Sequence, residues 1–103
     1  MTVGDVGVII QVNVSALGFT LAQDATCTMY AAPAWPVNAV AQPLTAVAIS
    51  LDGTFGVYTT TGVEAFSGGD WKFWLKQLTP QVRTTPTPPP SQYVYISAAP
   101  NGN

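Results

Sequence analysis

Apolar and polar residues alternate along much of the chain, and a period of two residues is typical of β-strands. The longest alternation runs from Val6 to Val14 and predicts a first strand. The segment 26–31 predicts a second strand, in which Cys27 and Met29 share one face. Pro33 is expected to end it, because proline lacks the N–H that a sheet ladder requires. Both segments therefore predict β-structure in the first third of the chain.

Three further segments have the same pattern. Residues 44–50 and 55–60 lie on either side of Asp52-Gly53, and an Asp-Gly pair between two strand-like runs is a strong hairpin signal. Residues 92–98 alternate tyrosine with aliphatic residues and predict a last strand. Phe66 lies in the loop before residues 68–78, and its side chain is expected to pack into the core.

The segment 68–78, G-G-D-W-K-F-W-L-K-Q-L, predicts the strand around which the others pack. Successive side chains on a strand point to opposite faces, which divides this segment into two rows. The row expected in the core consists of Trp71, Phe73 and Leu75. The row expected to face solvent or a partner consists of Lys72, Trp74 and Lys76.

Residues 79–91, T-P-Q-V-R-T-T-P-T-P-P-P-S, are of a different kind, with five prolines in thirteen residues. Such a segment favours polyproline II and is expected to stay out of any ladder. We interpret it as a stiff arm before the last strand rather than as a boundary between domains. Its composition also resembles an SH3-type ligand, with Arg83 nearby, although an arm that drapes over a neighbouring subunit fits a chain of this size better.

These elements predict an all-β fold in one domain, residues 1–103. Six or seven short antiparallel strands with turn signals between them favour an Ig-like β-sandwich. A jelly roll or a small barrel is the alternative. The architecture by itself assigns no function.

Charged residues make up 8% of the chain, against about 25% in an ordinary soluble domain. A free monomer normally keeps a charged surface, so this composition favours a chain whose surface is covered by neighbouring subunits. A neutral, hydroxyl-rich extracellular module is the alternative. The net charge of −2 argues against a nucleic-acid partner, which calls for a basic surface.

The composition also limits the chemistry. The chain has no histidine and one cysteine, which excludes imidazole catalysis and a disulfide within the chain. The five acidic residues stand at predicted turns and strand ends, where carboxylates commonly accept backbone hydrogen bonds. We therefore expect no enzymatic activity, no metal and no cofactor. The sequence contains no evident signal peptide and no apolar stretch long enough for a membrane span, so we expect no membrane partner and assembly in the host cytoplasm.

The order of the features resembles the small Ig-like domains of tailed-bacteriophage virion proteins. The likeness comes from a leading Gly-Asp, the segment F-T-L-A-Q-D-A-T-C-T-M-Y, the hairpin that closes with F-G-V-Y-T-T-T, and the small-residue turn Ser67-Gly68 before Trp71. It covers about residues 4–98. It implies an attachment component of the upper baseplate or tail fibre that contacts copies of itself and other virion proteins. The proline-rich insertion departs from the common pattern, which leaves capsid decoration as the alternative.

A binding module for a host-surface glycan or receptor is a second alternative, because several aromatic residues can stack on sugars. Trp74 stands out, since alternation places it opposite the core row. It is expected either to be covered by the segment 86–90 or to anchor a partner, as tryptophan often does. The candidate interface residues are Trp74, Lys72, Lys76, Trp35, Arg83, Pro86, Pro88, Pro89 and Pro90.

Overall fold

A computed structural model describes residues 1–14, 20–36, 38–79 and 81–98 and confirms the all-β prediction. Its strands are β1 (Val6–Asn13), β2 (Thr26–Pro33), β3 (Gln42–Leu44), β4 (Ala48–Ile49), β5 (Phe55–Thr61), β6 (Gly69–Thr79), β7 (Arg83–Thr84) and β8 (Val94–Ile96). A 3-10 turn, η2 (Pro90–Gln92), precedes β8.

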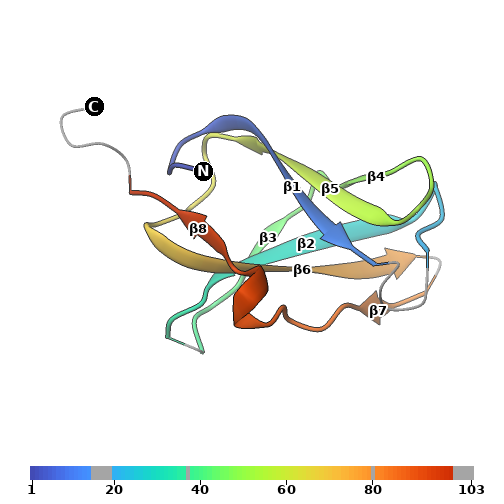
Figure 1. Cartoon of the computed structure of the whole chain (residues 1–103). Helices are drawn as coiled ribbons and strands as arrows, with labels where there is room; N and C mark the ends of the chain where they lie inside the picture. The colour runs from blue at the N-terminus through green and yellow to red at the C-terminus, as the bar shows by residue number, and fades with distance from the viewer. Residues whose placement is uncertain (15–19, 37, 80, 99–103) are drawn as a thin grey trace.

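The strands form two antiparallel sheets that pack as a sandwich (Figure 1). The smaller sheet has the order β1-β5-β4. The larger sheet has the order β3-β2-β6-β7, and β8 pairs with β6 on the same side as β7. Strand β1 lies against β6, and β5 lies against β2.

Strand β6 is central, as the alternation predicts. It pairs with β2 over nearly its whole length, and with β7 and β8 on its other side. The predicted core row, Trp71, Phe73 and Leu75, is buried. Phe66 is buried against it, with its ring edge-on to Trp71 and Phe73 at centroid distances of 5.0 and 6.0 Å. Cys27 and Met29 of β2 are buried in the same core.

Strand β1 follows the predicted alternation only in its second half. Ile10 and Val14 are buried and Val12 is partly buried. Val6, which the pattern places on the same face, is 74% exposed. The register with β5 shifts between Val6 and Ile9, and Gly7 has a positive φ of 79°. A bulge of this kind offsets the alternation by a residue.

The prediction of one continuous strand over residues 44–50 is wrong. The segment divides into β3, which pairs with β2 in the larger sheet, and β4, which pairs with β5 in the smaller one. The chain therefore crosses between the layers at residues 45–47. A period of two cannot reveal such a crossing, because residues on both strands alternate in the same way.

The hairpin at Asp52-Gly53 is confirmed. Gly53 has a φ of 74°, and its carbonyl accepts a hydrogen bond from Leu21 N–H at 2.8 Å. A Cβ at this position would lie 2.4 Å from the Leu21 carbonyl oxygen. The turn thus requires glycine both for its backbone angle and for the close approach of a second segment.

The expectation that the whole segment 79–91 stays out of the ladders is also wrong; residue 80 of this segment is not among the described residues. Arg83 and Thr84 pair with Gln77 and Lys76 as β7. Thr85 continues the contact, and the segment leaves β6 only from Pro86. Prolines stand at 80, 86, 88, 89 and 90, whereas residues 81–85 all have an N–H that can donate, which is why a short strand forms there. From here on, "the arm" means residues 86–89.

Candidate interaction surfaces

The outer face of the larger sheet carries an aromatic pair. Trp74 of β6 lies directly opposite Tyr30 of β2, and their rings stack with centroids 5.8 Å apart and an interplanar angle of 20°. Both side chains are partly exposed. Lys72 and Lys76 share this face of β6, as predicted, and are partly buried on either side of Trp74 along the strand. Trp74 therefore has Tyr30 as its aromatic neighbour on this face, whereas the arm lies beside Phe73, which belongs to the opposite row of β6.

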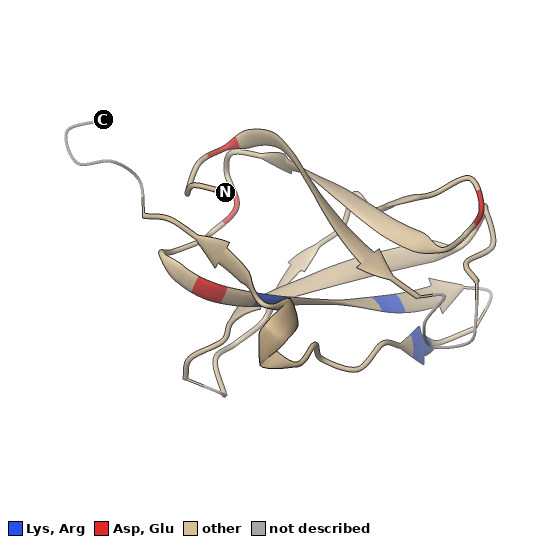
Figure 2. Cartoon of the chain, viewed as in Figure 1, with Lys and Arg blue, Asp and Glu red and all other residues tan. Residues whose placement is uncertain are grey.

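All basic side chains of the chain lie in this larger sheet (Figure 2). Lys72 and Lys76 are on β6 and Arg83 is exposed on β7. Of the acidic residues, Asp70 is on β6, and the other four are in turns and loops. The chain is acidic overall, yet the outer face of β6 has two cations beside an aromatic pair.

Trp35 forms a separate feature. It follows the end of β2, its side chain is 66% exposed, and its peptide bond to Pro36 is cis. It lies between Pro33, the last residue of β2, and Pro36. Trp35 is a large apolar side chain in solvent, and exposed tryptophan is common at binding hot spots.

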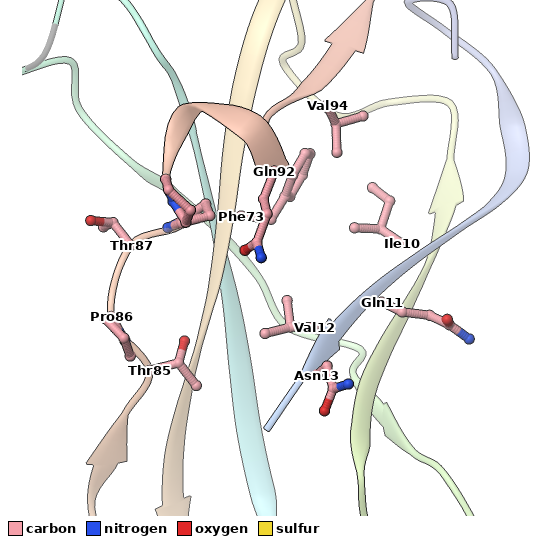
Figure 3. A pocket seen from close by; sticks show the side chains of 12 residues that line it. Ile10, Gln11, Val12, Asn13, Phe73, Thr85, Pro86, Thr87, Gln92 and Val94 are labelled. Atoms are coloured by element: carbon pink, nitrogen blue, oxygen red, sulfur yellow. The ribbon is translucent and has the colours of Figure 1, made fainter. Parts of the chain in front are cut away.

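The arm borders a pocket of about 470 Å³ (Figure 3). Pro86, Pro88 and Pro89 line one side, whereas Pro90 opens η2. The apolar lining comes from three strands: Ile10 and Val12 of β1, Phe73 of β6 and Val94 of β8. The remaining lining residues are uncharged and polar: Gln11, Asn13, Thr85, Thr87 and Gln92. The predicted interface residues therefore divide between two places, the outer face of β6 and this pocket.

Large apolar side chains are exposed on both sheets and in the loops. Within the described residues they are Val6, Ile9, Trp35, Val40, Leu51, Val63, Leu78, Val82 and Tyr95. Scattered exposed apolar residues are ordinary in soluble proteins. What distinguishes this chain is that so few charges separate them, since charged residues are 8% of the sequence.

Among the described residues, Glu64 has the most strongly shifted pKa, and its carboxylate closes a loop. Its Oε2 accepts hydrogen bonds from the Tyr58 hydroxyl at 2.5 Å and from the N–H and hydroxyl of Thr61, and its Oε1 accepts from Gly62 N–H at 3.1 Å. Burial acts to raise the pKa of Glu64, but the hydrogen bonds from Tyr58 and Thr61 outweigh it and lower that pKa to about 2. Burial and the carboxylate together raise the pKa of Tyr58 to about 12.

A second pocket, of about 350 Å³, adjoins this pair. A carboxylate with a pKa near 2 is a weak base, and Glu64 already accepts from four donors. Its geometry is that of a loop-closing carboxylate.

Metal-ligating and nucleophilic side chains are scarce among the described residues. This part of the chain contains no group of three or more metal-ligating side chains. Cys27 is buried, and burial raises the pKa of its thiol, which makes the thiolate scarce at neutral pH. No helix in the described ranges is both long and apolar enough to cross a membrane.

Sequence reasoning missed the pocket beside β1 and the role of Thr85. The pocket depends on which strands are neighbours, and a period of two carries no information about neighbours. Gly7 within the first alternation was the one available signal for the bulge in β1, because glycine inside a strand often marks one.

The chain was compared with protein-family models, with curated proteins and with solved structures, and none of the three comparisons found a match.

Proposed function

We propose that this chain is a non-enzymatic structural subunit of a tailed-bacteriophage particle. In this proposal it is a component of the tail, the baseplate or the fibre attachment, and it contacts copies of itself and other virion proteins. The observation that carries the proposal is the surface: large apolar side chains are exposed on both sheets of a chain with 8% charged residues. A free protein with such a surface tends to associate, whereas a subunit in an assembly has the surface covered.

The assignment to a phage rests on the sequence resemblance to Ig-like virion domains. The architecture, a sandwich of two antiparallel sheets, supports this resemblance at the level of the fold. The well-engaged Glu64 and the buried Cys27 support a role without catalysis.

Quantitative mass spectrometry of purified phage particles tests the proposal, with heads and tails separated before analysis. We expect several copies of the chain per particle, in the tail fraction. Recovery in the head fraction would favour capsid decoration instead. Absence from both fractions would contradict a structural role in the virion.

A variant tests whether the predicted surfaces make the contacts. Trp74→Ala combined with deletion of residues 86–90 removes the aromatic pair, the whole arm and Pro90. We expect fewer copies of this variant per particle. We also expect its circular dichroism spectrum to match that of the original chain, which would show that the variant folds. Thr28→Ala, on the same outer face of β2, is the matched control and should be incorporated normally. Unchanged incorporation of the double variant would show that these surfaces are wrongly assigned.

One observation favours a second candidate, a module that binds a host-surface glycan. The stacked Tyr30–Trp74 pair, with Lys72 and Lys76 beside it, combines rings for sugar contact with cations for acidic groups. Titration of the chain with host polysaccharide, followed by tryptophan fluorescence, tests it. A saturable change that Trp74→Ala abolishes supports glycan binding, and an unchanged spectrum contradicts it.

A further inference from the structure

On the side of the molecule where the arm lies, the larger sheet extends further than the smaller sheet. Strand β1 is one of the two outer strands of the smaller sheet and lies against β6. The larger sheet continues past β6 into β7, the arm and β8 (Figure 1). Among the described residues no strand of the smaller sheet pairs with β1 on its other side. One layer of the sandwich is therefore a strand narrower than the other.

The free edge of β1 presents backbone hydrogen-bonding groups. Val14 N–H donates to the Thr54 carbonyl at 2.8 Å, so the backbone of Val14 points toward the β5 side. Backbone groups alternate in direction along a strand, which points those of Ile10 and Val12 toward β5 as well. The N–H and carbonyl groups of Ile9 and Gln11 therefore point outward.

The facing edge of β6 has a similar gap. Leu75 bonds Thr85 through both its N–H and its carbonyl, so its backbone points away from β2. By the same alternation the N–H and carbonyl of Phe73 point to that side too. Pairing with β8 resumes only at Trp71 and Val94. Between these points lies the arm, and Pro86, Pro88 and Pro89 have no N–H to donate to the Phe73 carbonyl.

The pocket of about 470 Å³ lies between these two edges. Figure 3 shows Ile10 and Val12 pointing from β1 toward Phe73, with Val94 above and Gln92 beside it. No charged residue is among those that line it. The pocket thus has an apolar floor, an uncharged rim and a strand edge along one wall.

We propose that β1 accepts an extended segment of a neighbouring polypeptide as a fourth strand of the smaller sheet. The added strand bonds the outward backbone groups of Ile9 and Gln11, and its inward side chains fill the pocket over Phe73 and Val94. Strand addition of this kind takes affinity from main-chain hydrogen bonds and specificity from pockets for alternate side chains. The lining selects an uncharged segment with apolar residues at every second position, because a buried charge has no partner there.

A lone segment fits this edge better than the edge of a second whole sandwich. The arm lines the same pocket as β1, and β7 and β8 flank it on β6. A second sandwich placed edge to edge with β1 would collide with the arm, β7 and β8. Residues 99–103, A-P-N-G-N, contain no large apolar side chain and are a poor strand sequence, so they do not supply the added strand. The occupant in this proposal is a segment of another chain.

The other sheet edges are less suited to strand addition. Strand β3 has three residues, of which one is Pro43, and β4 and β7 have two each. Short strands, proline and charge are the usual protections of an edge, and Arg83 supplies the charge on β7. Strand β1 has eight residues without charge, and Ile9, 62% exposed, is available to a cross-strand neighbour.

This inference rests on the proposed function for the claim that neighbouring chains cover this surface. Its test uses only purified chain and a synthetic peptide, acetyl-TVTVTVT-amide, so its failure is distinguishable from absence of the chain from particles. Amide resonances and exchange rates are followed by NMR. In the free chain we expect the amides of Ile9, Gln11 and Phe73 to exchange at least about a hundred times faster than those of Ile10 and Val12.

The peptide should produce saturable shifts at Ile9, Gln11 and Phe73 at concentrations on the order of millimolar, and it should slow their exchange. Gln11→Pro removes an outward N–H and should abolish binding. A sheet edge tolerates proline, so the substitution is compatible with the strand. Gln11→Ala keeps the N–H and should therefore bind the peptide more tightly than Gln11→Pro. Acetyl-TVTPTVT-amide, interrupted on the ligand side, should not bind, and this control holds even where Gln11→Pro fails to fold.

Three results would overturn the inference. They are slow exchange of Gln11 and Phe73 in the free chain, absence of saturable shifts with acetyl-TVTVTVT-amide, and equal binding of the two peptides.

Discussion

Thr85 bonds Leu75 as a strand partner would, but it does so partly through its side chain. Its N–H donates to the Leu75 carbonyl at 2.9 Å, and its Oγ1 accepts from the Leu75 N–H at 2.9 Å. The residue is 4% exposed, the lowest value between β7 and η2. This contact fixes where the arm leaves β6, and with it the position of the pocket wall.

Thr85→Val should lower the free energy of unfolding by about 1–3 kcal/mol, because it leaves the Leu75 N–H buried without its acceptor. Chemical denaturation measures the change. Thr84→Val, at the exposed neighbouring position in β7, is the matched control and should change stability by less than about 0.5 kcal/mol. Equal effects of the two substitutions would mean that the Thr85 hydroxyl is not the anchor.

Gly53→Ala should destabilise the chain by more than about 2 kcal/mol, since it combines a positive φ with a backbone clash. The added Cβ would meet the Leu21 carbonyl oxygen at 2.4 Å. Gly4→Ala is the control for the angle alone, because Gly4 has a φ of 87° and nothing within 4 Å of the added atom. It should cost about 1 kcal/mol. Thermal or chemical unfolding that ranks Gly4→Ala as the more damaging would contradict the close approach seen at the hairpin.

The Glu64 carboxylate should contribute stability that depends on pH. Its pKa is lowered to about 2 in the folded chain from an ordinary value of 4.5. The folded state therefore binds fewer protons than the unfolded state between these values. The stabilisation is fully present above about pH 4.5 and is lost as the pH falls through about 2. Because the group is partly exposed and solvent screens its interactions, we expect a loss of roughly 1 kcal/mol.

Denaturation curves at several pH values check this prediction. Glu64→Gln should flatten the stability profile between about pH 4.5 and 2, and Tyr58→Phe should raise the Glu64 pKa and narrow that window. A profile in this range that is the same with and without Glu64 would show that the carboxylate has little to do with acid stability.

The stacked pair Tyr30–Trp74 should be coupled in a double-mutant cycle. Cross-strand aromatic pairs contribute about 0.5–1.5 kcal/mol beyond their burial. Tyr30→Ala, Trp74→Ala and the double variant, each measured by chemical denaturation, should give a coupling in that range. Additive effects would mean that the rings merely lie near each other. Lys72→Ala with Tyr30→Ala serves as the comparison on the same face and should be close to additive.

Much of the fold follows from the sequence for a physical reason. A strand that is buried on one face must alternate, so the rows on β6, the hairpin at Gly53 and the burial of Phe66 were predictable from residue order. The crossing between β3 and β4 was not, because both halves alternate alike. The bulge in β1 and the short strand β7 also escaped prediction, since each depends on a neighbouring strand for its bonds.

The candidate surfaces likewise combine features that the sequence predicts with features that depend on neighbouring strands. The outward position of Trp74 between Lys72 and Lys76 follows from alternation within one strand. Its stacking on Tyr30 depends on the register between β6 and β2, which the sequence does not encode locally. The pocket beside β1 depends on which layer is wider, and only the packed sandwich defines that.

Hydroxyl-radical footprinting, read out by mass spectrometry, tests most directly whether neighbours cover this chain. The free chain and the assembled particle are oxidised under the same dose. We predict that Ile9, Trp35 and Tyr95, all exposed in the isolated chain, are oxidised several-fold less in the particle. Equal oxidation of these side chains in the free chain and in the particle would contradict the account.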